Sequence, residues 1–369
     1  MNAKVSNIKH EGDVYKMTLS NLNVSFANSI RRAIISELPV CVIRTETEKI
    51  NQCRIEVNTS RLHNEILKHR LSCIPIILKY DELDSLVEKY ELVVEVSNTG
   101  DNILFVTTED FRLRNKKSGN FCTKEQTRKI FPPNKKTNYY IDFMRLRPKI
   151  SDNIPGEEIR LVADFSISDG LTNSSFNAVS KCAYMYTPDI VAANAAWEDI
   201  LAKKRADNIS EKDIAFDKKN FDILDSQRIF VEDSFDFVIQ GIGMYENDEM
   251  VRLACNILQK KFAGVIEKLD ADIVSILNSE TTMSNCFDVI LENEDYTVGK
   301  VIEFVIYDAF YQKEKTLSFC GFKKFHPHDT KSTLRLAFND ATERSIASSY
   351  VKIACETAIA VFGHIGKMF

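Results

Sequence analysis

The sequence predicts an α+β fold made of two similar modules, the first of which is interrupted by a β-rich insert. Three observations predict it. Each module ends in a long, one-sided helical pattern, strand-like segments gather in the middle of the chain, and the order strand, short helix, strands, long helix occurs twice. The 369 residues suit two or three domains, and 44% apolar with 27% charged residues is an ordinary composition for folded proteins. This composition excludes a disordered chain, a collagen and a coiled-coil rod.

Neither a membrane span nor a secretion signal is expected. No run approaches the roughly 18 apolar residues that a helix needs to cross a bilayer, and the first residues lead into polar ones. The nine cysteines are scattered without the spacing of metal ligands. We therefore expect free thiols in a reducing compartment, no metal and no cofactor.

The first half begins with an amphipathic helix and continues into strands. The helix is predicted over 25–38, where Pro39 ends it, and a second helix over 60–71, with Leu62, Ile66 and Leu67 facing inward. The insert then shows β-branched and aromatic runs bounded by glycine and proline turns. These runs predict strands at 91–96, 103–107, 139–143 and 158–167.

The middle of the chain leads to the longest helical pattern. A helix is predicted over 189–206, and the polar residues that follow, through Asp225, are interpreted as an extended connection. A strand at 232–240 precedes the pattern at 247–269. The apolar stripe of this pattern includes Val251, Leu258, Phe262 and Ile266. A helix so long and so one-sided needs a partner.

The last hundred residues repeat the order of elements. They predict a strand at 287–291, a helix at 296–310, strands at 317–322 and 333–338, and a closing helix at 342–361. The stripe of that closing helix includes Ile346, Tyr350, Ile353 and Val361. Residues 23–30 align without gaps on 295–302, with small residues, Ala27 and Gly299, at one matching position. We expect the stripes of the two long helices to pack together.

Domain boundaries follow from this pattern. Residues 1–40 and 234–269 form the first, discontinuous module. Residues 41–233 form the β-rich insert with its extended connection, and residues 270–369 form the second, smaller module.

A basic segment lies inside the insert. From Arg112 to Lys149 there are twelve basic residues against two acidic ones, a net charge of +10 in a chain whose total is −5. The segment includes Lys116, Lys117, Lys135 and Lys136. It could contact nucleic acid, but no nucleic-acid motif accompanies the charge, and a solvated loop or a patch that meets an acidic partner protein explains it better.

Two blocks in the first half resemble the α-like subunits of cellular DNA-directed RNA polymerases. Residues 26–39 (FANSIRRAIISELP) resemble the signature helix of that family. Residues 58–60 (NTS) and 69–75 (HRLSCIP) resemble its second block. The helix at 247–269 is similar to the long dimerisation helix of the third-largest subunit of eukaryotic polymerase II.

The C-terminal hundred residues resemble the smaller subunit that pairs with it, the eleventh subunit, through 294–299 (EDYTVG) and 320–328 (CGFKKFHPH). The resemblance implies two RNA polymerase α-like dimerisation modules in one chain, an intramolecular pseudo-heterodimer, as in large DNA viruses. It implies work in the virion and in the cytoplasm of the infected cell if the source is viral, and in the nucleus otherwise.

The resemblance also implies function and partners. The chain is expected to be a non-catalytic scaffold on which the largest and second-largest polymerase subunits assemble, together with a small zinc-binding subunit. No homodimer and no membrane are needed, and any contact with nucleic acid is expected to be indirect or weak. The alternatives are a single-stranded nucleic-acid-binding protein that uses residues 112–149, and an enzyme with an unrecognised site.

The family match assigns Asn28, Arg31 and Arg32 to contact with a large subunit, because the planar fork of arginine pairs bidentately with carboxylates. A solvated helix face is the alternative for the arginines. His69 and Arg70 are assigned either to this docking surface or to local packing.

Little in the sequence suggests catalysis. We find no phosphate-binding loop, no nucleophile elbow and no zinc-protease helix. His326, His328 and Asp329 are the ligand types that come closest together, and a loop explains them better than a metal site.

Overall fold

The computed structural model describes residues 2–151, 154–280 and 283–369. The chain forms two compact units. The first unit comprises Met1–Ile34, Lys181–Gln240 and Asn247–Phe369, and the second unit comprises Ile35–Ser180 and Gly241–Glu246. Most of the expected insert forms the second unit, but residues 181–233 belong to the first, because β11 and β12 join a sheet there. Residues 270–369 lie in that same first unit.

Two four-stranded sheets build the first unit, in the orders β1-β2-β12-β11 and β13-β14-β16-β15. Their strands are β1 (Lys4–Glu11), β2 (Val14–Ser20), β11 (Val179–Pro188), β12 (Phe230–Gly241), β13 (Ser275–Asn278), β14 (Cys286–Glu292), β15 (Leu317–Lys323) and β16 (Lys331–Phe338). Buried and less buried side chains alternate along β14, as expected for a strand in a sheet with one covered face, and Val289 and Leu291 point to the covered face. On its other face, the Asp288 carboxylate accepts two 2.7 Å hydrogen bonds from Arg335 of β16.

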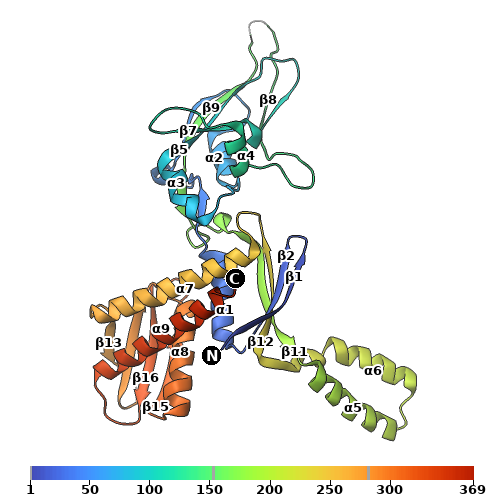
Figure 1. Cartoon of the computed structure of the whole chain (residues 1–369), viewed down its shortest axis with the longest axis vertical. Coiled ribbons are helices and arrows are strands. Elements are labelled where there is room, and N and C mark those ends of the chain that lie inside the picture. Colours follow the sequence, from blue (N-terminus) through green and yellow to red (C-terminus); the bar gives the residue numbers. More distant parts are fainter. Residues whose placement is uncertain (1, 152–153, 281–282) are drawn as a thin grey trace. The chain divides into compact units, whose positions relative to one another are not determined.

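Six α-helices belong to the described part of the first unit, and the two longest lie side by side (Figure 1). They are α1 (Val24–Ser36), α5 (Ile190–Ala206), α6 (Glu211–Ile223), α7 (Asn247–Asp270), α8 (Tyr296–Ile306) and α9 (Arg344–Gly366). A π-helical stretch, Tyr307–Lys313, continues α8. The predicted bounds of α7 agree within one residue, and α9 extends five residues beyond its prediction.

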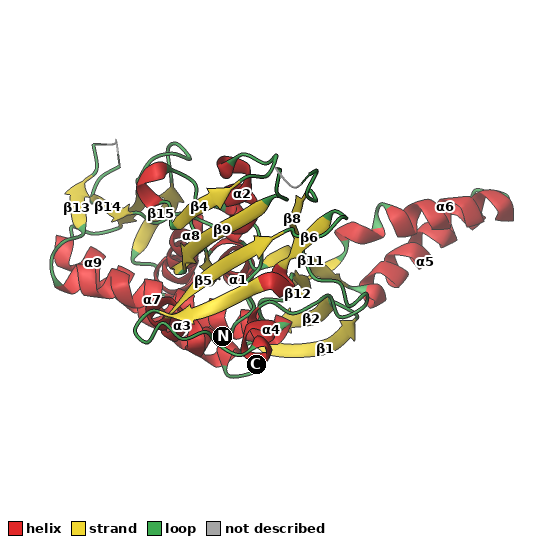
Figure 2. Ribbon diagram, turned by 90° about the horizontal axis from the view of Figure 1, so that it is seen from above, coloured by secondary structure: helices red, strands yellow, loops and turns green. Residues whose placement is uncertain are grey.

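The α5–α6 hairpin corrects one expectation, because the residues before Asp225 are not an extended connection. Ser210 caps α6 by accepting a hydrogen bond from the backbone N–H of Asp213 at 3.3 Å. Ile214 and Phe221, two turns apart, then pack on Trp197 of α5. The hairpin projects from the β11–β12 end of its unit (Figures 1 and 2).

The closing helix α9 is long and apolar enough to cross a membrane, by length and composition alone. Its apolar side is covered by α7, α8, β13 and β14 within the first unit. The core helix of a globular unit has the same apolar composition. Because α9 packs against four elements of its unit, its composition is explained by burial in that unit.

The second unit contains a sheet of order β4-β9-β5-β7 and two strand pairs, β3 with β10 and β6 with β8. Its strands are β3 (Val40–Val42), β4 (Cys53–Asn58), β5 (Tyr90–Ser97), β6 (Leu104–Thr107), β7 (Phe111–Asn115), β8 (Asp142–Leu146), β9 (Glu158–Asp164) and β10 (Ser166–Ser168). Its helices are α2 (Asn64–Ser72), α3 (Leu83–Lys89) and α4 (Lys124–Ile130).

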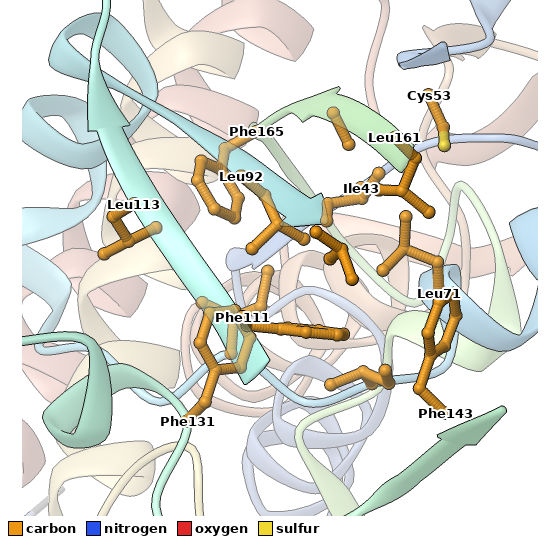
Figure 3. Close-up of a cluster of buried hydrophobic side chains, with 14 of the residues drawn as sticks. Ile43, Cys53, Leu71, Leu92, Phe111, Leu113, Phe131, Phe143, Leu161 and Phe165 are labelled. Atoms are coloured by element: carbon orange, nitrogen blue, oxygen red, sulfur yellow. The ribbon is translucent and has the colours of Figure 1, made fainter. Parts of the chain in front are cut away.

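The core of the second unit gathers around aromatic rings (Figure 3). The ring of Phe111 meets those of Phe131 and Phe143 edge to face, with centroids 5.3 and 5.6 Å apart. In α2, Leu67 is fully buried, whereas Ile66, which we expected to face inward, is 45% exposed. The helix begins at Asn64, later than predicted, and its buried residues are Leu67 and Leu71.

Candidate assembly interface

Helices α7 and α9 pair along most of their length in the first unit. Leu258 and Phe262 of α7 are fully buried, and the ring of Phe262 stacks on that of Phe362 with centroids 5.8 Å apart. The side-chain amide of Gln259 donates a 3.1 Å hydrogen bond to the carbonyl oxygen of Ile359, which gives this polar side chain a partner within the pair.

Small residues let the two helices approach closely. A Cβ atom on Gly363 would lie 2.6 Å from Nε2 of Gln259, and one on Gly366 would lie 3.3 Å from Cβ of Cys255. Ala354 and Ala358 are fully buried in the same helix. The face of α9 that meets its neighbours is therefore made largely of small side chains.

This geometry revises the residues expected to pack between the helices. Val251, Leu258, Phe262 and Val361 are buried as expected, and Ile266 is partly buried. Ile346 and Ile353, however, are 42% and 44% exposed. The buried face of α9 consists of Ala347, Val351, Ala354, Cys355, Ala358, Val361, Phe362 and Ile365. Val361 therefore lies on the packed side of α9, whereas Ile346 and Ile353 lie off it.

Tyr350 packs elsewhere than expected. Its ring lies parallel to that of Phe310, in the stretch that follows α8, with centroids 3.6 Å apart. Its hydroxyl donates a 3.0 Å hydrogen bond to Oγ1 of Thr316. Tyr350 therefore holds α9 to the elements after α8.

A second contact joins α1 to the start of α8. Nε of Arg32 donates a 2.8 Å hydrogen bond to Oγ1 of Thr297, and Nη2 forms an ion pair with the Asp295 carboxylate. Oγ of Ser29 lies 2.5 Å from the carbonyl oxygen of Thr297. The ring of Phe26 meets that of Phe362 at 5.2 Å, so α1, α8 and α9 share one core.

Asp295 also caps α8. Its carboxylate accepts a 2.8 Å hydrogen bond from the backbone N–H of Thr297. Burial alone would raise the pKa of the Asp295 carboxyl, but hydrogen bonds from Thr297 and the charges of Arg32 and Lys261 lower it below its ordinary value. The negative charge at the helix start is therefore part of the folded structure.

Arg32 and Arg70, expected at a docking surface, have partners inside the chain. Arg32 pairs with Asp295, and this partner was not foreseen because it lies more than 260 residues away. Nε and Nη2 of Arg70 each donate a 2.7 Å hydrogen bond, to the carbonyl oxygens of Phe143 and Asp142. Local packing therefore accounts for two of the N–H groups of Arg70.

The other three docking candidates differ among themselves. Arg31 donates through Nε and Nη2 to Oδ1 of Asn28 at 3.0 and 2.9 Å, so these two partly buried side chains act as a pair on α1. The side chain of His69 is exposed in the second unit.

Part of the positive charge of the basic segment is neutralised by acidic residues of the same unit. Arg114 pairs with Glu91, and Lys116 pairs with Asp164 at 2.8 Å. Lys117, Lys135 and Lys136 are exposed. The net charge of +10 therefore overstates the charge offered to a partner.

No cluster of metal ligands appears among residues 2–151, 154–280 and 283–369. No three His, Cys, Asp or Glu side chains gather there as metal ligands would. The backbone N–H of His328 donates to Nδ1 of His326 at 3.1 Å, and that of His326 to the Asp329 carboxylate at 2.9 Å, which makes a closed turn. Burial raises the pKa of the Cys255 thiol to about 12, so this cysteine behaves as an apolar core residue.

Several residues of the interface were not predicted from the sequence. Asp is a preferred residue directly before a helix, and a helix is predicted to begin at 296, so the sequence does indicate Asp295 as a cap. Ser29, Gln259 and Gly363 carry no comparable signal, because their roles depend on a partner distant in sequence.

Comparison with known proteins identifies the family. The model of the RNA polymerase Rpb3/Rpb11 dimerisation domain matches residues 16–262. Over 284 residues the chain is 24% identical to DNA-directed RNA polymerase subunit Rpo3 of Pyrococcus horikoshii, an alignment that covers 72% of this chain and 97% of that protein.

Two further relatives match over shorter stretches. Subunit Rpo3 of Pyrococcus furiosus is 31% identical over 105 residues, 28% of this chain and 38% of that protein. Subunit 3 of DNA-directed RNA polymerases II, IV and V of Arabidopsis thaliana is 25% identical over 213 residues, 53% of this chain and 61% of that protein. Because the family match covers more than half of the chain and includes α1 and most of α7, this protein belongs to the Rpb3/Rpb11 dimerisation-domain family of RNA polymerase subunits.

Proposed function

We propose that this chain is the assembly scaffold of a multisubunit DNA-directed RNA polymerase, and that it nucleates the assembly of the two large catalytic subunits. The α7–α9 pair is the observation that carries the proposal. The first two thirds of helix α7 lie within the matched dimerisation domain, and the helix that covers α7 lies beyond the match, in the same chain. Catalysis then belongs to the partners.

Residues 270–369 act, in this proposal, as a second dimerisation module joined to the first. The alignment with Rpo3 of Pyrococcus horikoshii covers 97% of that protein but only 72% of this chain. More than a quarter of this chain therefore has no counterpart in that protein, as a second module would require. Joining the modules makes their docking intramolecular, with an effective concentration on the order of mM. No separate small partner and no homodimer are then required.

The partners in this proposal are the largest and second-largest polymerase subunits and a small zinc-binding subunit. The Asn28–Arg31 pair on α1 is the proposed contact with a large subunit, since Arg32 is held by Asp295. The joining of two modules supports a viral source, with work in the virion and the cytoplasm of the infected cell; a cellular source would place the work in the nucleus.

The first test is purification of the tagged chain from its source with its partners. We expect both large subunits to accompany it, and expect Asn28→Ala with Arg31→Ala to remove one of them while the chain stays folded. Lys212→Ala, at an exposed residue of α6 outside the basic segment, is the control and should leave copurification unchanged. Purification without either large subunit would refute the scaffold proposal.

The second test divides the chain after Asp270. Coexpressed as two polypeptides, residues 1–270 and 271–369 should copurify in equal amounts. Leu258→Asp in the first fragment should abolish their association, because the charge would be buried against α9. Fragments that remain monomeric and separately folded would contradict the two-module proposal.

A further inference from the structure

A pocket lined by four arginines opens in the second unit between α2 and β8. Its volume is about 480 Å³, within the range of small ligand sites. The charged lining consists of Arg61, Arg70, Arg145, Arg147, Asp142 and Glu157. Four positive charges against two negative ones leave the lining at +2, in a concave site.

The arginines of this pocket differ in how far they are already committed. Arg147 is paired with Glu157, whose carboxylate also accepts a 2.7 Å hydrogen bond from the Arg147 backbone N–H. Arg145 lies 3.5 Å from the Asp142 carboxylate, a loose ion pair on an exposed side chain. Arg61 is exposed and forms no ion pair with any residue that the structure describes. Arg61 and Arg145 are therefore the groups available to an incoming anion.

Arg70 gives the pocket a fixed positive wall. Its two hydrogen bonds to the carbonyl oxygens of Phe143 and Asp142 hold the guanidinium in place and use two of its five N–H groups. These bonds also occupy carbonyl groups of β8. A partner is therefore bound through side chains rather than by adding a strand to β8.

Apolar residues complete the lining. Leu62 is partly buried, and Ile103 is 56% exposed. Beside them the ring of Phe105, 50% exposed, supports the Arg145 guanidinium, with 4.6 Å from its Cζ to the ring centroid. The pocket therefore offers apolar contact and two available guanidinium groups at once.

We infer that this pocket binds an acidic peptide segment of a partner protein, with one apolar side chain against Leu62 and Ile103 and carboxylates on Arg61 and Arg145. The planar fork of arginine matches a carboxylate bidentately, and arginine is enriched at protein interfaces. A nucleic acid fits less well, because the exposed Lys117, Lys124 and Lys135 do not line the pocket and give it no row of cations along a phosphate backbone.

The test uses the full purified chain and a fluorescent peptide with one leucine and one phenylalanine flanked by four carboxylates. Fluorescence anisotropy should show saturable binding that weakens with added salt. Arg61→Ala with Arg145→Ala should raise Kd about tenfold or more, the effect of losing charge-assisted hydrogen bonds. The matched control is Lys124→Ala with Lys129→Ala, two exposed cations on α4 that lie outside the pocket, and it should leave Kd unchanged.

Four outcomes would overturn the inference, and the first three concern the acidic peptide and an oligonucleotide. These are absence of saturable binding, equal losses in the pocket variant and the α4 variant, and tighter binding of a single-stranded oligonucleotide that Arg61→Ala with Arg145→Ala weakens. The third would assign the pocket to phosphate. A peptide in which lysines replace the carboxylates should not bind, and its binding would show that the apolar contact alone accounts for the signal.

Discussion

Two antiparallel helix pairs of the first unit illustrate what makes a helix pair part of a core. The α7–α9 pair joins helices of 24 and 23 residues, and the α5–α6 pair joins helices of 17 and 13. Nine residues of α7 alone are buried. The core of the α5–α6 hairpin contains three buried residues, Trp197, Ile214 and Phe221.

The difference arises from the other elements that cover each pair. Helix α9 packs on α7, on α8 and on two strands, and Phe26 of α1 adds its ring to the same core. The hairpin leaves large apolar side chains in the open, with Val191 at 82% and Ile223 at 71% exposed. We therefore expect α7 and α9 to unfold only with their whole unit, and α5 and α6 to open locally.

The largest expected effect comes from charging the buried pair. Leu258→Asp buries an unpaired carboxylate and removes a fully buried leucine, so we expect a loss of at least about 4 kcal/mol and unfolding of the first unit. Urea unfolding followed by circular dichroism measures this loss in the free energy of unfolding. Ile223→Asp on the hairpin is the control and should change stability by less than about 0.5 kcal/mol. Equal effects of the two substitutions would remove the distinction between the pairs.

Trp197→Ala should affect the hairpin alone. The hairpin core is small, and losing an indole costs about 3–5 kcal/mol, so α5 and α6 should lose their structure while the rest of the unit persists. Hydrogen exchange resolved by peptide should show loss of protection over 190–223 and unchanged protection in α7 and α9. Loss of protection across both pairs would mean that the hairpin folds cooperatively with the unit.

The elements that the sequence predicted well are those with strong, one-sided patterns. α7 was found within one residue, and Pro39 correctly marked the region where α1 ends. The α6 helix was missed because its polar residues outnumber the two, Ile214 and Phe221, that carry its packing. The strand predicted at 139–143 begins only at Asp142, because Asn134 and Asn138 form a turn with Asn138 at φ 57°.

Interface residues were harder to predict than elements. The alignment of the two repeats drew attention to Gly299 of α8, and the residue that lies against it is Phe322 of β15. On α9, Val361 lies on the packing side as predicted but Ile346 and Ile353 do not, because the alanines and glycines that allow close approach add little to an apolar pattern. The Arg32–Asp295 pair depends on contact between distant segments, which no local pattern encodes.

Gly299→Ala should have a smaller effect than the loss of either helix core. A Cβ atom there would lie 2.1 Å from the Phe322 ring, so the ring or helix must move at a cost of about 1–3 kcal/mol. Gly264 of α7 is the control, since no atom lies within 4 Å of its Cβ position, and Gly264→Ala should stabilise by about 0.5–1 kcal/mol. The midpoint of thermal unfolding should fall for Gly299→Ala and rise for Gly264→Ala. A shift of both midpoints in the same direction would contradict the packing of α8 on β15.

The smallest expected effect is a pH dependence at the α1–α8 junction. The pKa of the Asp295 carboxyl is lowered from the ordinary 3.8, so its ionised form stabilises the folded state above about pH 4, and this stabilisation is lost as pH falls through the lower folded pKa. Asp295→Asn keeps a capping oxygen but removes the charge beside Arg32. The variant should be less stable than the parent by about 1 kcal/mol at pH 6, the screened value for a partly exposed pair, and the gap should close toward pH 3. Urea unfolding at both pH values measures the gap, and a gap independent of pH would mean that Arg32 gains nothing from the ionised carboxylate.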